Sequence, residues 1–203
     1  MTDDHIVRDV AALEELYGKP SEASLVKVAD RLTPLYAKWI VAARFCVLSS
    51  VGPHGTDGSP RGDEGPVVQI ADETTLLMPD WRGNNRMDSL RNIVADGRIS
   101  LMFFVPGSQN VVRVNGKAVV SLDPSLIARF ADRGRKPRSV IVITVAEVYS
   151  QCARALMRSG LWNQPKALDE LPTIGELLAE QKADIDAAAY DAAWASRAEK
   201  TMW

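Results

Sequence analysis

The sequence has few of the residues that hold metal ions. Only two of its 203 residues are histidine, His5 and His54, and only two are cysteine, Cys46 and Cys152. A zinc site needs three or four clustered histidine, cysteine or carboxylate ligands. These four residues form no such cluster along the chain. The sequence therefore predicts no metal site, and two cysteines do not make a disulfide framework.

The common nucleotide-binding and hydrolase motifs are also missing. The chain has neither a Walker phosphate-binding loop nor a G-x-G-x-x-G fingerprint. A serine hydrolase would have to use His54, which no nucleophile-elbow motif accompanies. If the protein is an enzyme, we expect a bound organic cofactor to carry the reaction.

Long apolar runs and a strong net charge are absent as well. No stretch approaches the roughly 20 apolar residues of a membrane-spanning helix. The first residues, Met-Thr-Asp-Asp-His, are unlike a secretory signal. A net charge of −2 gives no general attraction to nucleic acid or to acidic membranes. We therefore expect a cytoplasmic protein with neither kind of partner.

What is present is the composition of a folded globular chain. Hydrophobic residues make up 46% and charged residues 25% of the sequence, and both values are ordinary. A chain of this length can bury a sizeable core in one domain. We expect a single domain over residues 1–203, with N-terminal helices at 1–44, a barrel at 45–150 and C-terminal helices at 151–203.

Apolar runs and alternating patterns predict six strands in the middle of the chain. The second and third are joined by a very short turn, so they should pair antiparallel. Few long helices separate the strands, which favours an antiparallel barrel over a doubly wound sheet. The strands are predicted at 45–51, 66–71, 75–79, 99–105, 110–121 and 139–149.

Glycine-containing segments interrupt this pattern at two informative places. Residues 56–65 are polar and rich in glycine, and we predict a loop there. Asn115-Gly116 lies inside the fifth predicted strand and fits either a hairpin turn or a bulge. We favour the bulge, which would bend one continuous strand.

Capping signals mark several helices. Thr33 followed by Pro34 is typical of a helix start. Thr173 and Glu176 form a T-x-x-E capping box ahead of an alanine-rich segment, where we predict one helix over about 174–200. Shorter helices are predicted at 87–95, 125–131 and 153–159.

One polar loop suggests a binding site. Gly83-Asn84-Asn85-Arg86 lies between a predicted strand and the helix that starts near Met87. The first N–H groups of a helix lack partners and carry a partial positive charge. With an arginine fork and two amides beside them, they would suit a phosphate. The alternative is an asparagine-capped helix with a solvated arginine, and spacing alone does not separate the two.

The order of these segments resembles the pyridoxamine 5′-phosphate oxidase-like family, the FMN-binding split barrels. The resemblance covers roughly residues 35–163, and it is carried by the order of several short stretches rather than by any one. It is strongest to a branch of proteins about this long. The stretches are Phe45–Ser50, Ser59-Pro60-Arg61-Gly62-Asp63, Gly83-Asn84-Asn85-Arg86 with Asp88-Ser89-Leu90 and Asn92-Ile93, Arg98–Phe104, and Arg113-Val114-Asn115-Gly116.

The resemblance implies an FMN-dependent oxidoreductase that acts on a small molecule. It also implies a homodimer with two FMN molecules in the clefts between its subunits. Asn110 and Val111 would approach the isoalloxazine edge, and Trp162 of the partner subunit would stack on the flavin. The residues implied for the flavin phosphate are Ser59, Arg61, Gly62, Asn84, Asn85, Arg86 and Ser89.

The chain departs from the vitamin B6 oxidases in two respects. Asn110 or Val111 stands where those enzymes have a flavin-contacting glutamine. Their C-terminal Arg-Leu-His-Asp-Arg-type substrate motif is replaced by residues 153–162, so we do not expect pyridoxamine phosphate as the substrate. Two alternatives stay open, namely a flavin-binding or sensor protein without turnover, and a split barrel that binds deazaflavin or heme.

Overall fold

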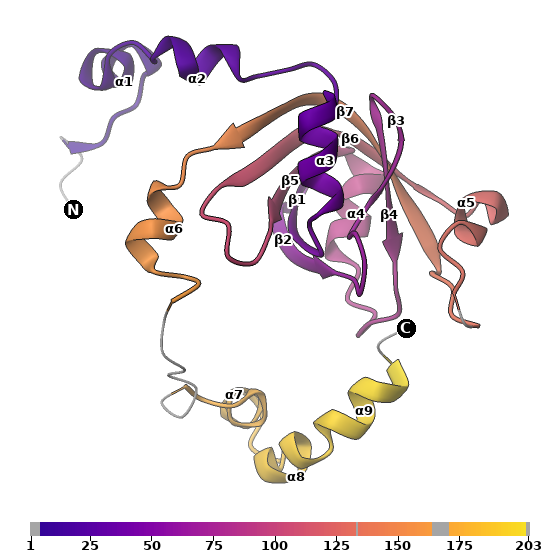
Figure 1. The fold of residues 1–203 in the computed structure, drawn as a ribbon. Helices are drawn as coiled ribbons and strands as arrows, with labels where there is room; N and C mark the ends of the chain where they lie inside the picture. Colours follow the sequence, from indigo (N-terminus) through magenta and orange to yellow (C-terminus); the bar gives the residue numbers. More distant parts are fainter. Residues whose placement is uncertain (1–4, 133, 164–170, 202–203) are drawn as a thin grey trace.

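A curled antiparallel sheet forms the centre of the molecule (Figure 1). The computed structural model describes residues 5–132, 134–163 and 171–201. The seven strands follow the order β2-β1-β5-β6-β7-β4-β3, which leaves β2 and β3 as edges and makes the barrel a split one. The strands are β1 Phe45–Gly52, β2 Gly55–Gly62, β3 Gln69–Asp72, β4 Thr75–Asp80, β5 Arg98–Phe104, β6 Val111–Ser121 and β7 Ser139–Gln151.

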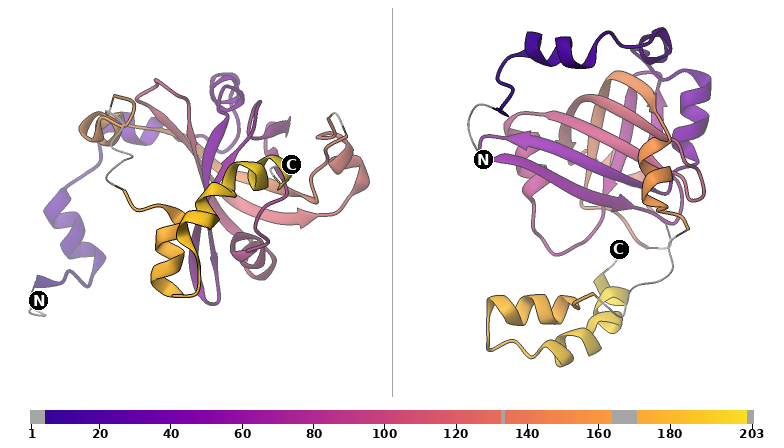
Figure 2. Two further views of the ribbon diagram at one scale, coloured as in Figure 1. Left: turned by 90° about the horizontal axis from the view of Figure 1, so that it is seen from below. Right: turned by 90° about the vertical axis from the view of Figure 1, so that its left-hand side faces the viewer.

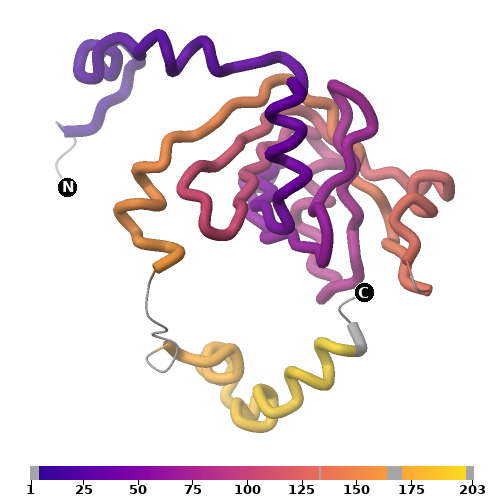
Figure 3. Tube along the Cα trace, viewed as in Figure 1, coloured from indigo at the N-terminus to yellow at the C-terminus, as the bar shows by residue number. Residues whose placement is uncertain are grey.

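Helices cover the sheet and extend away from it at both ends of the chain. α3 and α4 pack on the strands, whereas α1, α2 and α6–α9 lie outside the barrel (Figure 2). Figure 3 traces these two outlying segments along the chain. Within the described residues, no helix is both long and apolar enough to cross a membrane. The helices are α1 Val10–Tyr17, α2 Glu22–Val26, α3 Pro34–Val41, α4 Asp88–Ala95, α5 Pro124–Ala128, α6 Arg154–Ser159, α7 Ile174–Gln181, α8 Ala187–Ala192 and α9 Trp194–Thr201.

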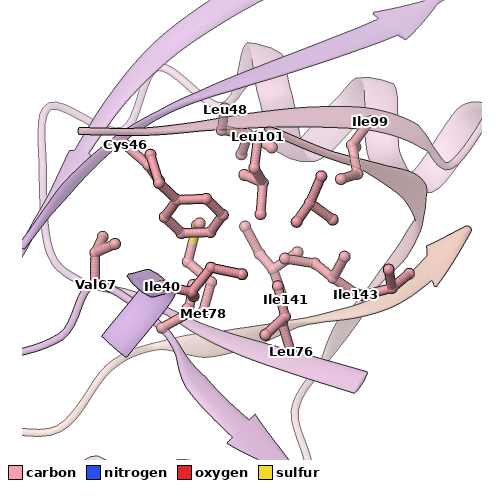
Figure 4. Packing of buried hydrophobic residues seen from close by; sticks show 14 of the residues in the cluster. Ile40, Cys46, Leu48, Val67, Leu76, Met78, Ile99, Leu101, Ile141 and Ile143 are labelled. Atoms are coloured by element: carbon pink, nitrogen blue, oxygen red, sulfur yellow. The ribbon is translucent and has the colours of Figure 1, made fainter. Parts of the chain in front are cut away.

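The core lies inside the curl of the sheet (Figure 4). Alternate residues of each strand point inward, as Cys46 and Leu48 do on β1, because side chains alternate between the two faces of a strand. α3 starts at the predicted Thr33–Pro34 signal and inserts the fully buried Ile40. Burial of such a side chain contributes about 1.5–3 kcal/mol, so the core is the main stabilising element of the barrel.

One strand was not predicted. Residues 56–65 were expected to be a loop, but most of them belong to β2, Gly55–Gly62. This strand pairs with β1 along its whole length, from Phe45 opposite Gly62 to Gly52 opposite Gly55. Backbone pairing needs no apolar side chains at an edge, where polar residues are common. The sheet therefore has seven strands rather than six, and Arg61 lies on a strand instead of a loop.

Two further predictions concerned β6 and the C-terminal segment. β6 runs through Asn115-Gly116 with a register shift against β7, so the bulge is confirmed.

The capping box at Thr173 is confirmed too, but the prediction of a single helix over 174–200 was wrong. The segment is divided into α7, α8 and α9, because Lys182 is extended and the Asp186 side chain starts a new helix by accepting from Ala189 N.

Candidate functional site

A cavity of about 820 Å³ lies at the open side of the barrel, where β2 approaches the end of β4 and the loop that follows. This volume falls within the roughly 300–1,000 Å³ of ordinary ligand sites. β2 and β4 are not neighbours in the sheet, so only side chains connect them here. Six residues predicted from the sequence line the cavity, namely Ser59, Arg61, Gly62, Asn84, Asn85 and Arg86.

Arg61 and Asp80 bridge the opening between these two strands. The Nη1 atom of Arg61 lies 2.7 Å from Oδ1 of Asp80, and the two side chains are only 19% and 14% exposed. The Nε atom of Arg61 is buried and has no acceptor among the described residues. Buried donors are nearly always paired. The Arg61 guanidinium therefore keeps a hydrogen-bond donor that the described part of the chain does not use.

The loop after β4 is shaped by its two asparagines. Asn84 Oδ1 accepts from Arg86 N at 2.9 Å, and Asn85 adopts a left-handed backbone with φ of 61°. Asn85 Oδ1 accepts from Arg138 Nη1 at 2.7 Å. The residue before α4 is Met87, whose side chain makes no capping bond. The asparagine-capped helix is therefore not what forms, and both amides remain at the cavity wall.

Ser89 lies outside this cavity lining. Its side chain is buried in the first turn of α4 and donates to the carboxylate of Asp57. Asp88 adds a second carboxylate to the same turn. Acidic groups are favourable at a helix N-terminus because they complement its partial positive charge. This helix end is already occupied by the chain's own anions, and the structure does not bring Ser89 to the other six residues.

Asn110, Val111 and Trp162 gather at a different place, around the β5–β6 turn. Trp162 Nε1 donates to the backbone oxygen of Ser108 at 2.7 Å, and Asn110 N donates to the Ser108 hydroxyl at 3.3 Å. Val111 is buried at the start of β6. Figure 1 draws this turn and α6 on one side of the barrel, and β4 on the other. Within one subunit, the ten predicted residues thus fall into two groups, with Ser89 apart from both.

Several other residues in the cavity wall were not predicted as site residues. Arg82 and Arg138 add two guanidiniums, and Trp194 reaches the wall from α9. A basic loop at 133–138 was visible in the sequence, but nothing in it indicated which arginine faces a ligand. Arg133 of that loop lies outside the described residues.

The cavity wall suits a ligand with both an anionic and an apolar part. Four arginines against three carboxylates leave a positive balance, although the whole chain is negative. The apolar side chains in the wall include Val67, Met78, Met87, Leu90, Val120 and Leu122, besides two tryptophans. Cofactor sites combine largely apolar walls with a few fixed polar groups. A phosphorylated aromatic molecule has this character.

A second cavity of about 580 Å³ shares Asp63, Glu64 and Trp81 with the first. Trp81 Nε1 donates to Asp63 Oδ2 at 2.8 Å, which fixes the indole in the common wall. Arg135 lies 3.0 Å from Asp132 and 3.4 Å from Glu64. The other arginine of this cavity, Arg129, donates to Gln69 Oε1 at 3.2 Å. With four arginines in its wall against two here, the first cavity is the candidate anion site.

Comparison of the sequence with known proteins gives one family match. A family model described as pyridoxamine 5′-phosphate oxidase matches residues 32–152. None of the curated proteins gives a significant match.

The chain also overlaps with several solved structures at low identity. HupZ of Group A Streptococcus is 15% identical, with a TM-score of 0.48 over 59% of this chain and 94% of that one. An FMN-binding protein of Syntrophomonas wolfei is 12% identical, with a TM-score of 0.44 over 57% and 84%. The FAD-binding protein of Mycobacterium smegmatis is 10% identical, with a TM-score of 0.42 over 61% and 97%. Overlaps below a TM-score of 0.5 are too weak to support a conclusion about cofactor or function.

Proposed function

The chain belongs to the pyridoxamine 5′-phosphate oxidase family, whose model matches residues 32–152, and we propose that it is an FMN-dependent oxidoreductase acting on a small molecule. When bound, the flavin supplies hydride or electron transfer, and the protein supplies binding and orientation. The observation that carries this proposal is the arginine-rich cavity at the open side of the barrel, where a buried donor of Arg61 has no acceptor among the described residues.

The phosphate of FMN fits the polar part of this wall. Arg61 and Arg86 supply guanidinium donors from two segments, and the amides of Asn84 and Asn85 supply N–H groups. Arg138, held against Asn85, adds a further positive charge. Guanidinium groups bind phosphate oxygens strongly because their charged hydrogen bonds can be bidentate.

The second group of predicted residues completes the site from another subunit in this proposal. Asn110, Val111 and Trp162 lie at the β5–β6 turn, away from the cavity of their own chain. Gln109 in this turn has a buried Oε1 without a donor among the described residues. A homodimer that places this turn beside the cavity of its partner provides both the isoalloxazine contacts and the stacking indole.

We also propose a cytoplasmic location, which the two unpaired cysteines fit. Cell fractionation tests this location.

The decisive experiment identifies the cofactor. We expect the purified protein to be yellow and to release FMN, identified by mass, when it is denatured. Deazaflavin or heme in the extract would replace FMN in the proposal. A colourless protein that also fails to quench the fluorescence of added FMN would remove the flavin altogether.

A second measurement separates an oxidoreductase from a passive flavin carrier. The bound flavin is reduced anaerobically, and its reoxidation is followed with candidate acceptors. An oxidoreductase transfers electrons to at least one acceptor faster than free reduced FMN does. Equal rates for bound and free flavin with every acceptor would favour the carrier.

A further inference from the structure

The three C-terminal helices form a small unit with contacts of its own. Gly175 N donates to Asp191 Oδ1 at 2.9 Å, and a Cβ atom at Gly175 would lie only 2.3 Å from the backbone oxygen of Ala187. α7 and α8 therefore approach more closely than any other residue at 175 allows. Arg197 of α9 stacks on the Tyr190 ring at 4.2 Å and donates to its backbone oxygen at 3.4 Å. These contacts fix α9 relative to α8.

This unit presents one large aromatic side chain to the proposed flavin cavity. Trp194, the first residue of α9, lines the cavity together with Met87 and Leu90 from the region of α4. Figure 1 draws α9 below the barrel, on the side where β4 ends. The Trp194 side chain is 59% exposed. Leaving so large an apolar surface in water is unfavourable, and such surfaces commonly mark contact sites.

We propose that Trp194 is a cofactor-binding residue and that α7–α9 cover the flavin in its cavity. This inference rests on the proposed function. The indole has a flat apolar face, and contacts between aromatic rings are favourable beyond the area that they bury. The Arg197 guanidinium, 5.7 Å from the Trp194 ring, helps to position the indole. Trp194 therefore acts on the ring system of the cofactor, whereas the arginines act on its phosphate.

This division of roles gives Trp194 a signature that differs from that of an arginine. Removal of an arginine that binds the phosphate weakens FMN binding and leaves the binding of riboflavin, which has no phosphate, unchanged. Removal of a side chain that contacts the ring system weakens the binding of both ligands alike. Cover by α9 also predicts that the bound flavin is shielded from solvent.

The experiment uses the full-length protein and three variants, Trp194→Ala, Trp194→Phe and Ile174→Ala. Ile174 is the matched control because it lies in the same helical unit, is 60% exposed and is outside the cavity lining. FMN and riboflavin are titrated by fluorescence, and iodide quenching measures how accessible the bound flavin is. Far-ultraviolet circular dichroism verifies that each variant is folded.

We expect Trp194→Ala to lower the affinity for both ligands about three- to tenfold, which corresponds to the free energy of one aromatic contact. The variant should also increase the quenching of bound flavin by iodide. Trp194→Phe should lie between the wild type and Trp194→Ala, and Ile174→Ala should match the wild type. If Trp194→Ala shows the same affinities and the same iodide quenching as Ile174→Ala, the assignment of Trp194 is wrong, while the proposed function is unaffected. A wild-type protein that binds neither flavin would overturn both.

Discussion

At the scale of single residues, Arg61 has two competing acceptors. Its Nη1 atom contacts the Asp80 carboxylate at 2.7 Å, and we propose the flavin phosphate as its second partner. Asp80 repels a phosphate but also holds the guanidinium at the cavity wall. Arg86 is different, because its side chain is 81% exposed even though it contacts Asp88 at 2.5 Å. Solvent screens such an exposed pair and leaves it worth little, so Arg86 is free to turn toward a ligand.

Loss of either arginine should weaken FMN binding selectively. A charged hydrogen bond contributes about 1.5–3 kcal/mol, which corresponds to about a ten- to a hundredfold loss of affinity. We expect Arg61→Ala and Arg86→Ala to fall in this range in a fluorescence titration with FMN, and to leave riboflavin binding nearly unchanged. Arg→Lys should restore affinity only in part, because lysine cannot make the bidentate fork.

The matched control for these variants is Arg91→Ala. Arg91 is an exposed arginine on α4 that lies outside the cavity lining, so the variant should bind both ligands like the wild type. Equal losses for FMN and riboflavin in Arg61→Ala or Arg86→Ala would indicate damage to the fold instead of a lost phosphate contact.

The two cysteines should differ strongly in reactivity. Burial raises the pKa of the Cys46 thiol to about 12. The backbone N–H of Arg154, with the charges of Arg154 and Lys27, lowers the pKa of the exposed Cys152 thiol below its usual 9.0. Only the thiolate is nucleophilic. Alkylation of Cys152 by iodoacetamide should therefore rise with pH and reach half its maximal rate below pH 9, while Cys46 stays unmodified in the folded protein.

Peptide mass mapping after timed alkylation checks this prediction. Both thiols should react once the protein is unfolded in urea, which controls for access. Modification of Cys46 at the rate of Cys152 in the folded protein would show that the barrel opens readily around β1.

At the scale of secondary-structure elements, the bulge in β6 decides how the sheet curls. Pairing with β7 shifts between Asn115 and Gly116, and bulges increase the local bend and twist of a strand. At Gly116 the backbone of β7 comes so close that a Cβ atom would lie 2.0 Å from the Thr144 oxygen. Glycine is required here by this close approach.

Gly116→Ala should therefore destabilise the protein. Separation of two central strands to admit a methyl group resembles the overpacking of a core, which costs about 1–3 kcal/mol. Gly58→Ala on the edge strand β2 is the matched control, because a Cβ atom there meets nothing within 4 Å. It should change stability by less than about 1 kcal/mol. Urea unfolding at one fixed protein concentration measures both, and equal stabilities would contradict the close approach.

α6 and the residues after it also bear on the choice of substrate. The family resemblance of the sequence implies that residues 153–162 stand in place of the substrate motif of the vitamin B6 oxidases. In this structure they form α6, and Trp162 packs on the β5–β6 turn. We expect the FMN-loaded protein to convert pyridoxamine or pyridoxine phosphate feebly or not at all. An assay for pyridoxal phosphate formation tests this, with a vitamin B6 oxidase as positive control, and robust turnover would show that the motif is dispensable.

At the scale of the whole molecule, the first two helices, α1 and α2, bury no residue against the described part of the chain. Isolated helices of fewer than about 12–15 residues are marginal in water, and these have 8 and 5. Their exposed apolar side chains are Val10, Leu13, Leu16, Tyr17, Leu25 and Val26. We propose that a second copy of the chain covers them, as the proposed site also requires.

We therefore predict a stable homodimer. Size-exclusion chromatography with light scattering should give twice the chain mass of 22.2 kDa at micromolar concentration. Leu16→Glu, which places a charge on the exposed apolar face of α1, should shift the population toward monomer. A monomer mass for the wild-type protein would contradict both the dimer and the assignment of Trp162 to a partner's flavin.

The sequence by itself determined the features that depend on residues close together in the chain. Alternation gave the apolar strands, Thr33-Pro34 and the Thr173–Glu176 box gave two helix starts, and Asn115-Gly116 gave the bulge. The short stretches at 59–63 and 83–86 line one cavity, and the phosphate site there stays a prediction. Each of these signals arises from local periodicity, capping or turn chemistry, which tertiary contacts did not override.

Only the tertiary structure decided which distant groups meet. Pairing with β1 made a strand of the polar residues 55–62, because backbone hydrogen bonds do not depend on side-chain polarity. Curling of the sheet brought Arg61 to Asp80 and added Arg138 and Trp194 to the cavity, while Ser89 turned to Asp57 instead. Spacing along a chain does not encode such contacts, because they depend on how the two ends of a curled, split sheet approach each other.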